Sequence, residues 1–279
     1  RRPSRPIWSH DPMNSLELFS GAGGLALGFS NAGFKHLGVF EWNKDACDTI
    51  RLNQIRGIPP IKDWNLVPGD VREHSFRNWA GKVTLVAGGP PCQPFSIGGK
   101  HRGSDDTRNM FPEAARCVRE TLPKAFVLEN VKGLLRKPFA TYFSYITLSL
   151  TYPFEPRRKG ESWQDHLGRL EKMHTKGYTG EVYYHVVFRL LNAADYGVPQ
   201  KRERVFIVGF RNDLNREWCF PEPSHTESAL LHSKWVTGEY WENHRIPRAR
   251  RPSSPPGVRG RVERAMAEDM FSALPWRTV

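Results

Sequence analysis

The stretch that most constrains the fold is residues 88–96 (GGPPCQPFS), which follow the apolar residues Val83, Leu85, Val86 and Ala87. An apolar run stopped abruptly by Gly-Gly-Pro-Pro predicts a buried strand that ends in a rigid loop, because proline locks the backbone angle φ. Open α/β sheets carry their chemistry at such strand ends. Cys92 is therefore a candidate nucleophile, although a lone cysteine is more often a small buried apolar residue.

Composition narrows the class of protein. The 279 residues are 39% hydrophobic, which suits one sizeable core and a small appendage. Four well-separated cysteines form no C-x-x-C pair, so we expect neither a zinc cage, nor any other metal, nor a disulfide framework. No apolar stretch has membrane-spanning length and no signal core is visible, so we expect a soluble intracellular protein. A net charge of +12 suggests a polyanionic partner, or serves solubility alone.

A glycine-rich turn predicts a cofactor pocket near the N-terminus. Residues 15–19 (SLELF) are a strand candidate that runs into SGAGG, and a helix candidate follows. Such a turn lets a ligand approach the backbone at the positive end of the helix dipole. Gly21, Gly23 and Ala26 also fit the dinucleotide fingerprint, with Glu41 as the ribose ligand. A tight turn without a ligand remains the alternative.

Two further strand ends supply residues suited to adenosine. Glu41 and Trp42 follow the strand candidate 37–40, where a carboxylate can accept from ribose hydroxyls and an indole can stack on adenine. Asp70 follows another short strand and could accept from an adenine amino group. An isolated loop acid such as Asp70 is more often only a turn residue.

Glu129 is the second candidate for chemistry. It follows the strand candidate 125–128, so it is expected at the same sheet edge as Cys92, although an acid there can also be a helix cap. Residues 200–204 (QKRER) precede another strand candidate and either flank it as simple charge or bind a phosphate or a base carbonyl. The polar, glycine-rich residues 98–109 suit a mobile flap or a plain solvated loop.

The ordered blocks FSGAGG, EW, GDV, GGPPCQPFS, ENV and QKRER resemble the successive motifs of the DNA cytosine-5 methyltransferases, over residues 15–211. The resemblance implies an α/β Rossmann-like methyltransferase fold, with helices on both faces of a mostly parallel sheet and one antiparallel strand near an edge. It also favours S-adenosylmethionine over a nicotinamide dinucleotide, with S-adenosylhomocysteine as product. The implied cofactor-binding residues are Phe19, Gly21, Gly23, Glu41, Trp42, Asp70, Val71, Pro91 and Met110.

The same resemblance implies a mechanism. The Cys92 thiolate would add to C6 of a flipped-out cytosine in duplex DNA, so that C5 can take a methyl group, while Glu129 interacts with N3. Arg204 would hold the base O2, and Arg202 would help to order this edge or would contact the backbone. The residues implied in holding DNA are Ser96, Lys100, Arg102 and Arg108. The resemblance further suggests a cytoplasmic bacterial enzyme of a restriction-modification system, associated with the nucleoid when bound to DNA.

The C-terminal part departs from the family pattern. We expect a basic tail at 1–14, a catalytic domain at 15–215, and at 216–279 a basic linker or the start of a target-recognition region. Residues 245–264, rich in arginine, could hold phosphates or be a solvated linker. The family's closing motifs are not found after residue 211. A fragment of a longer chain, a subunit completed by a second polypeptide, or a degenerate homologue would explain this.

Alternative functions remain open on the sequence alone. A catalytically silent DNA-binding or accessory subunit that keeps the fold is the main one. A nicotinamide-dependent oxidoreductase is disfavoured by Trp42 and by the PPCQPFS loop. Charge does not distinguish DNA from RNA as the substrate.

Overall fold

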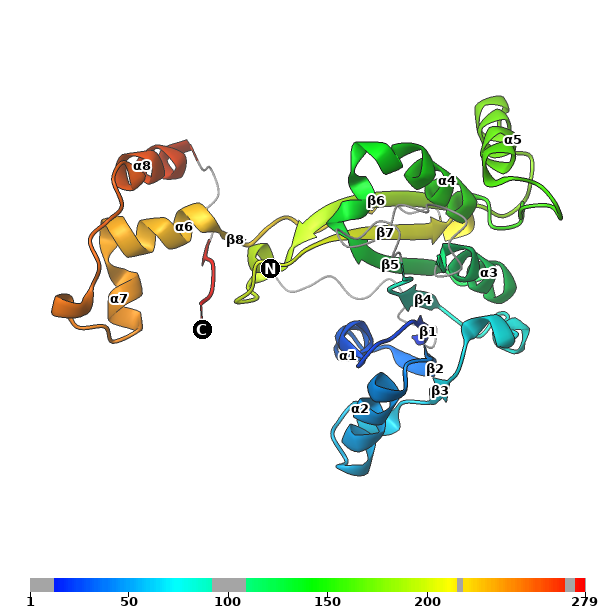
Figure 1. The fold of residues 1–279 in the computed structure, drawn as a ribbon, viewed down its shortest axis with the longest axis horizontal. Coiled ribbons are helices and arrows are strands. Elements are labelled where there is room, and N and C mark those ends of the chain that lie inside the picture. The colour runs from blue at the N-terminus through cyan, green and yellow to red at the C-terminus, as the bar shows by residue number, and fades with distance from the viewer. Residues whose placement is uncertain (1–12, 92–108, 215–217, 269–273, 279) are drawn as a thin grey trace. The chain divides into compact units, whose positions relative to one another are not determined.

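The computed structural model describes residues 13–91, 109–214, 218–268 and 274–278. The chain divides into two compact units (Figure 1). Unit 1 comprises residues up to 189 together with 205–216. Unit 2 comprises residues 190–204 and those from 217 onward. None of the described helices is long and apolar enough to cross a membrane.

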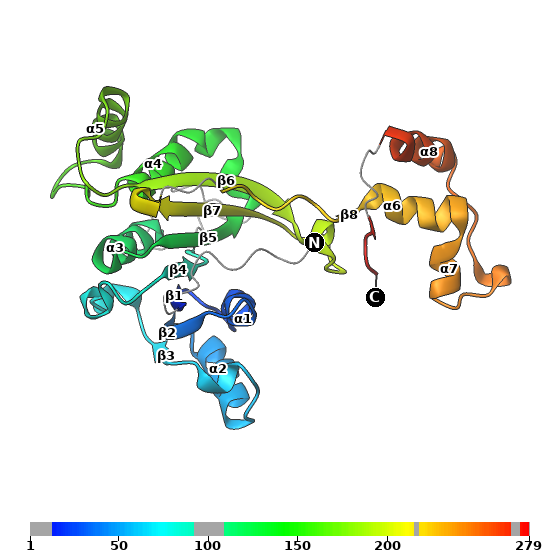
Figure 2. The ribbon, with the colours of Figure 1, turned by 180° about the vertical axis from the view of Figure 1, so that it is seen from behind.

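The centre of unit 1 is a seven-stranded sheet with the order β3-β2-β1-β4-β5-β7-β6. Figures 1 and 2 show the strands in this order, from β3 at the bottom to β6 at the top. The five neighbouring strands β3, β2, β1, β4 and β5 all pair in parallel. The strands are β1 (Asn14–Leu18), β2 (Lys35–Glu41), β3 (Leu66–Pro68), β4 (Leu85–Gly88), β5 (Ala125–Val131), β6 (Tyr184–Asn192) and β7 (Glu203–Arg211).

Strand β7 runs antiparallel to its neighbours. The end of β7 meets the start of β6, where Asn212 N donates to Tyr183 O at 3.0 Å. The end of β7 also meets the start of β5, where Arg211 N donates to Lys124 O at 2.9 Å. Contact between the end of one strand and the start of its neighbour defines an antiparallel pair. The expectation of a mostly parallel sheet with one antiparallel strand near an edge is confirmed.

Helices cover both faces of the sheet, as expected. Consecutive strand residues point to opposite faces, and Val39 and Phe40 of β2 show what lies on each. Val39 packs with Ala26 of α1 (Gly24–Asn31) and Ile50 of α2 (Lys44–Ile55). Phe40 makes edge-to-face ring contacts with Phe76 and Trp79. Phe76 in turn lies under the Arg116 guanidinium of α3 (Phe111–Thr121), 4.8 Å from its ring centroid.

Two more helices extend unit 1 after β5. Helix α4 (Ala140–Thr151) is followed by α5 (Trp163–Lys176). Two tyrosine–histidine hydrogen bonds attach α5 to the α4 region: Tyr145 Oη to His166 Nδ1 at 3.0 Å and Tyr152 Oη to His174 Nδ1 at 2.6 Å. Helix α5 is therefore a docked element rather than a free arm.

Unit 2 combines short helices with a two-stranded sheet. Its helices are α6 (Glu227–His232), α7 (Glu239–Asn243) and α8 (Val258–Glu268), and β8 (His225–Thr226) pairs in parallel with β9 (Leu274–Pro275). Trp276 Nε1 donates to Asp195 Oδ1 at 2.9 Å, and Lys201 Nζ lies 4.6 Å from the Trp276 ring centroid. Residues 190–204 thus fold with the C-terminal region, which their position in the sequence did not suggest.

Gly88 shows how tightly the central strands pack. A Cβ atom at this position would lie 2.4 Å from the carbonyl oxygen of Leu18, in the neighbouring strand β1. We predict that Gly88→Ala lowers the free energy of unfolding by about 3 kcal/mol, since backbone cannot yield as a flexible side chain does. Urea unfolding would measure the change.

The matched control is Gly168→Ala in α5, where nothing lies within 4 Å of the added Cβ. This change should stabilise the protein by about 0.5–1 kcal/mol, because alanine is the better helix former. Equal midpoints for the Gly88 variant and the unmodified protein would contradict the packing argument.

Candidate active site

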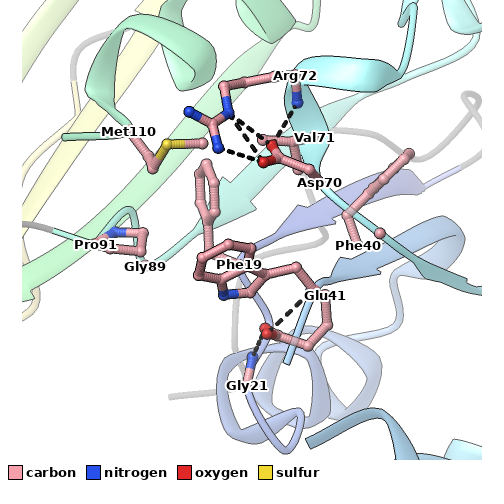
Figure 3. Close-up of a pocket in the computed structure, with 12 residues that line it drawn as sticks. Phe19, Gly21, Phe40, Glu41, Asp70, Val71, Arg72, Gly89, Pro91 and Met110 are labelled. Carbon is pink, nitrogen blue, oxygen red and sulfur yellow. Dashed lines mark hydrogen bonds and ion pairs between the residues drawn. The ribbon is translucent and has the colours of Figure 1, made fainter. Parts of the chain in front are cut away.

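A cavity of about 320 Å³ opens at the carboxyl ends of the parallel strands (Figure 3). Each of β1 to β4 contributes the residues that follow or end it, as expected for ligand sites in open α/β sheets. Phe19 holds a positive φ of 55° at the end of β1, an uncommon conformation for a side-chain-bearing residue. The lining residues are Phe19, Gly21, Phe40, Glu41, Trp42, Gly69, Asp70, Val71, Arg72, Gly89, Pro91 and Met110.

The Glu41 carboxylate is held by three backbone N–H groups. Oε2 accepts from Gly21 N at 2.7 Å, and Oε1 accepts from Asn43 N at 2.8 Å and from Trp42 N at 3.1 Å. A carboxylate offers about four acceptor positions, so room for one more donor remains. The Trp42 side chain beside it is 69% exposed. This pairing of an oriented acid with an open indole face suits a ribose and its base.

Asp70 forms a bidentate pair with Arg72 in the same wall. Arg72 Nε donates to both carboxylate oxygens at 3.0 and 2.9 Å, and Nη2 donates to Oδ2 at 2.5 Å. These hydrogen bonds lower the pKa of Asp70 below its ordinary value. Asp70 also accepts from Arg72 N and so begins the short helical turn Val71–Glu73. It is both a turn residue and a pocket residue, so the two interpretations of the sequence are compatible.

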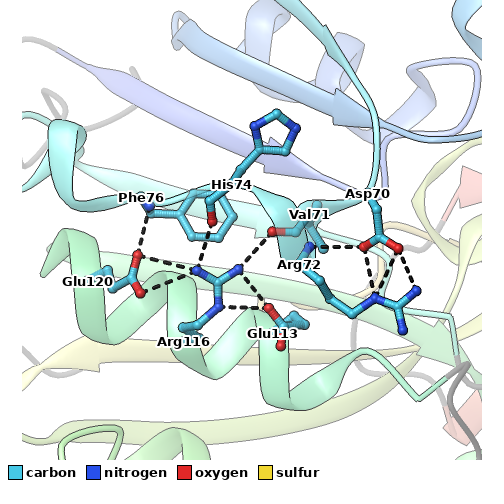
Figure 4. A network of polar contacts seen from close by, with 8 residues as sticks. All are labelled: Asp70, Val71, Arg72, His74, Phe76, Glu113, Arg116 and Glu120. Carbon is cyan, nitrogen blue, oxygen red and sulfur yellow. Dashed lines mark hydrogen bonds and ion pairs between the residues drawn. The ribbon is translucent and has the colours of Figure 1, made fainter.

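Arg116 of α3 supports this wall from behind (Figure 4). Its Nη2 donates to Val71 O at 2.7 Å and its Nη1 to His74 O at 2.9 Å, while its Nε donates to Glu113 at 2.7 Å. Glu120, one turn further along α3, accepts from Phe76 N at 2.7 Å. The segment after β3 is thereby fastened to α3, which begins directly after the pocket residue Met110.

Glu129 lies beside the start of the proline loop. Its Oε2 is 3.6 Å from the position that a Cβ on Gly89 would occupy. The next residue, Asn130, is buried and donates from Nδ2 to Pro90 O at 2.9 Å. The residues ENV and GGPP of the sequence are therefore in contact through adjacent strands β5 and β4.

The chain leaves this point at Pro91 and returns to it at Met110, whose N donates to Pro91 O at 3.4 Å. Both ends of the intervening segment therefore sit at the cavity. Cys92, Ser96, Lys100, Arg102 and Arg108 lie outside the described residues.

The structure brings together eight of the nine residues that the sequence indicates for the cofactor. Gly23 is the exception: it does not line the cavity, and a Cβ there would lie 2.5 Å from the Trp64 ring. Its φ of +92° and this close contact both require glycine. Gly23 thus serves the packing of the turn against Trp64.

Four lining residues were not identified from the sequence: Phe40, Gly69, Arg72 and Gly89. Phe40, Gly69 and Arg72 directly adjoin identified residues, and Gly89 is two positions from Pro91, so extending each motif by one or two positions would have found them. The pairing of Arg72 with Asp70 is visible only in three dimensions.

Arg202 and Arg204, which the sequence indicates for the base and its surroundings, belong to unit 2. Arg202 N donates to Asn192 Oδ1 at 3.1 Å, and Arg204 Nη1 donates to Glu203 O at 2.8 Å. Within the described ranges no group of three or more His, Cys, Asp or Glu residues could hold a metal ion.

A family model and curated relatives match most of this chain. The family model described as C-5 cytosine-specific DNA methylase matches residues 13–152 and 164–253. Type II methyltransferase M.NgoMIV of Neisseria gonorrhoeae is 41% identical over 210 residues, which are 75% of this chain and 55% of that protein. Type II methyltransferase M.AquIA of Picosynechococcus is 40% identical over 222 residues, covering 76% of this chain and 77% of that protein.

A solved structure has the same fold. It is described as a DNA modification methyltransferase encoded within an Escherichia coli prophage, and it superposes with a TM-score of 0.51 at 25% identity. The superposition covers 74% of this chain and 49% of that one. The chain thus spans about half the length of M.NgoMIV and of this structure.

Proposed function

Since this chain belongs to the C-5 cytosine-specific DNA methylase family, we propose that it carries the methyl-transfer site of a DNA cytosine-5 methyltransferase. One observation supports this most strongly. The Glu129 carboxylate lies against Gly89, next to a cavity built from strand-end residues. An acid, the start of a cysteine-bearing loop and a nucleoside-sized cavity therefore meet at one sheet edge, which is the arrangement that this reaction needs.

We propose that the cavity holds S-adenosylmethionine, which supplies an electrophilic methyl group on a sulfonium when bound. The residues present suit it. Glu41 has one acceptor position left for a ribose hydroxyl, and the exposed Trp42 indole offers a face for adenine. Phe40 and Met110 supply apolar wall.

In the proposed reaction, Cys92 attacks C6 of cytosine as the thiolate. The new bond between sulfur and C6 moves an electron pair toward C5, which is otherwise a poor nucleophile, and C5 then takes the methyl group. Loss of the C5 proton and breakage of the bond between sulfur and C6 release the methylated base and the thiolate. Over one turnover the thiolate is regenerated, the methyl group replaces the C5 proton, and that proton is released to solvent. The sulfonium donor would lose its bond to the methyl carbon and become the neutral thioether S-adenosylhomocysteine.

Glu129 is proposed to act at N3 of the ring, where negative charge builds up as sulfur adds to C6. A carboxyl group hydrogen-bonded to N3 stabilises that charge and shares a proton with it. The buried Asn130 side chain donates to Pro90 O, which fixes the strand end that carries Glu129 against the proline loop. Arg204 is proposed to hold the base O2 and Arg202 to order the neighbouring backbone.

A base inside a duplex cannot reach a loop cysteine, so the target cytosine is proposed to leave the stack. Ser96, Lys100, Arg102 and Arg108 are the proposed phosphate contacts near the thiol. In unit 2, residues 245–264 hold seven arginines and one glutamate. Arg261 and Arg264 are exposed on α8 there. This basic surface is proposed to hold the DNA backbone. A further segment or second polypeptide is proposed to complete target recognition.

Mechanism-based trapping tests the function. A duplex carrying 5-fluorocytosine cannot lose a proton from C5, so with S-adenosylmethionine it should stay covalently attached to the protein. Mass spectrometry of the digested adduct should place the linkage on Cys92. A silent accessory subunit would bind the duplex without forming an adduct, and an RNA enzyme would trap only on the corresponding RNA.

A further inference from the structure

Arg72 lines the proposed cofactor cavity, but the function proposed above gives it no role. Figure 3 shows Gly89 and Pro91 on one side of Phe19 and Asp70 on the other. The reacting methyl group has to face Gly89, because the Glu129 carboxylate lies there. The adenine base is at the far end of the nucleoside from the sulfonium, so it is left the side of the cavity that carries Asp70 and its partner Arg72.

The Asp70–Arg72 pair has hydrogen-bonding capacity to spare. The Asp70 carboxylate accepts three hydrogens, from Arg72 N, Nε and Nη2, whereas a carboxylate offers about four acceptor positions. The Arg72 guanidinium carries five N–H donors, and its Nη1 makes no hydrogen bond to any residue that the structure describes. The pair therefore presents a free acceptor and free donors next to each other at one cavity wall.

An adenine edge has the complementary pattern. Its 6-amino group donates, and the ring nitrogens on either side of that group, N1 and N7, accept. The sequence indicates Asp70 as the acceptor for the amino group, which leaves the neighbouring ring nitrogen for a donor beside Asp70. Hypoxanthine carries an oxygen in place of the amino group, and this oxygen would face the carboxylate as acceptor against acceptor.

We propose that Arg72 determines specificity for adenine by donating to the ring nitrogen next to the 6-amino group, while Asp70 accepts from that group. This inference rests on the proposed cofactor. Because the two side chains carry opposite charges, the pair contributes hydrogen bonds of defined direction rather than net attraction. The bidentate contact with Asp70 already holds the guanidinium fork in place, so little side-chain freedom is lost when a base binds.

Calorimetric titration of the full chain with S-adenosylhomocysteine and with its 1-deaza and 7-deaza analogues tests the proposal. Each analogue replaces one ring nitrogen by C–H and so removes one acceptor. For the unmodified chain, one of the two analogues should bind about 10-fold more weakly than S-adenosylhomocysteine, as expected for the loss of a hydrogen bond to a charged group. In Arg72→Met, S-adenosylhomocysteine itself should bind about 10-fold more weakly, and that analogue should now bind equally well.

Arg51→Met is the matched control. Arg51 also pairs with an aspartate, Asp48, at 3.0 Å, and its side chain is 46% exposed against 48% for Arg72, but it does not line the cavity. This variant should bind all three ligands as the unmodified chain does. Unchanged melting temperatures would show that both variants are folded.

Equal losses for all three ligands in Arg72→Met would overturn the proposal, because Arg72 would then act only by holding Asp70 or by contacting the amino-acid part of the ligand. Unchanged affinities in this variant would overturn it as well. If S-adenosylhomocysteine binds and only the dependence on the ring nitrogen is missing, the proposed function stands. If the unmodified chain binds none of the three ligands, the proposed cofactor is wrong and the role of Arg72 falls with it.

Discussion

Cys92→Ser is expected to abolish methyl transfer, with turnover lower by on the order of 10⁴-fold or more, as for the loss of other covalent nucleophiles. A serine hydroxyl is almost fully protonated at neutral pH and adds poorly to C6 of a pyrimidine. Transfer of a radiolabelled methyl group to duplex DNA would measure the loss. The covalent adduct with 5-fluorocytosine should vanish in parallel.

The variant should still bind S-adenosylmethionine, because the cavity is built from other residues. Cofactor affinity is thus an internal control for folding. Residual turnover within about 10-fold of the unmodified protein would be incompatible with covalent catalysis by this thiol, since a missing nucleophile costs far more than that.

Glu129→Gln is expected to lower the turnover number by about 10²–10⁴-fold, the range for removal of a general acid. The amide keeps the size of the side chain beside Gly89 but cannot share a proton with N3 of the base. The change should fall on turnover and leave the KM for S-adenosylmethionine within about twofold, because Glu129 does not line the cofactor cavity. Steady-state kinetics at saturating DNA would separate the two parameters.

Glu171→Gln is the matched control, because it removes one carboxylate from an exposed position on α5 that has no part in the proposed site. It should behave like the unmodified protein. If Glu129→Gln instead raises KM for the cofactor and spares turnover, Glu129 belongs to the cofactor site and its proposed action at N3 is wrong.

Much of the fold follows from short-range patterns. Apolar runs that end in glycine or in a polar residue predict β1, β2, β4 and β5 close to where they lie, because a strand buried on both faces needs such a run. The carboxyl ends of parallel strands lie at the same edge of the sheet, so the residues that follow these strands lie close together there. This is why eight of the nine expected cofactor residues share one cavity.

Other features depend on contacts between distant residues, and no local pattern encodes them. Gly23 fits the pattern of a cofactor-binding turn, whereas the Trp64 ring that packs beside it is visible only in the structure. Arg116 looks like an ordinary helix residue, yet it fastens the segment after β3 to α3. Residues 190–204 run from the end of β6 to the start of β7 and nevertheless fold with the C-terminal region.

The linear sequence alone shows which residue types follow the strands, and these indicate the family and the kind of chemistry. They can be recognised there because a glycine turn or a reactive loop occupies only a few consecutive positions. Which side chains support those groups, as Arg116 supports the segment after β3, is decided only by the tertiary structure. The physical reason is that packing and charge balance are set by neighbours in space, and in this chain those neighbours are commonly 40 or more positions apart, as Gly23 and Trp64 or Val71 and Arg116 show.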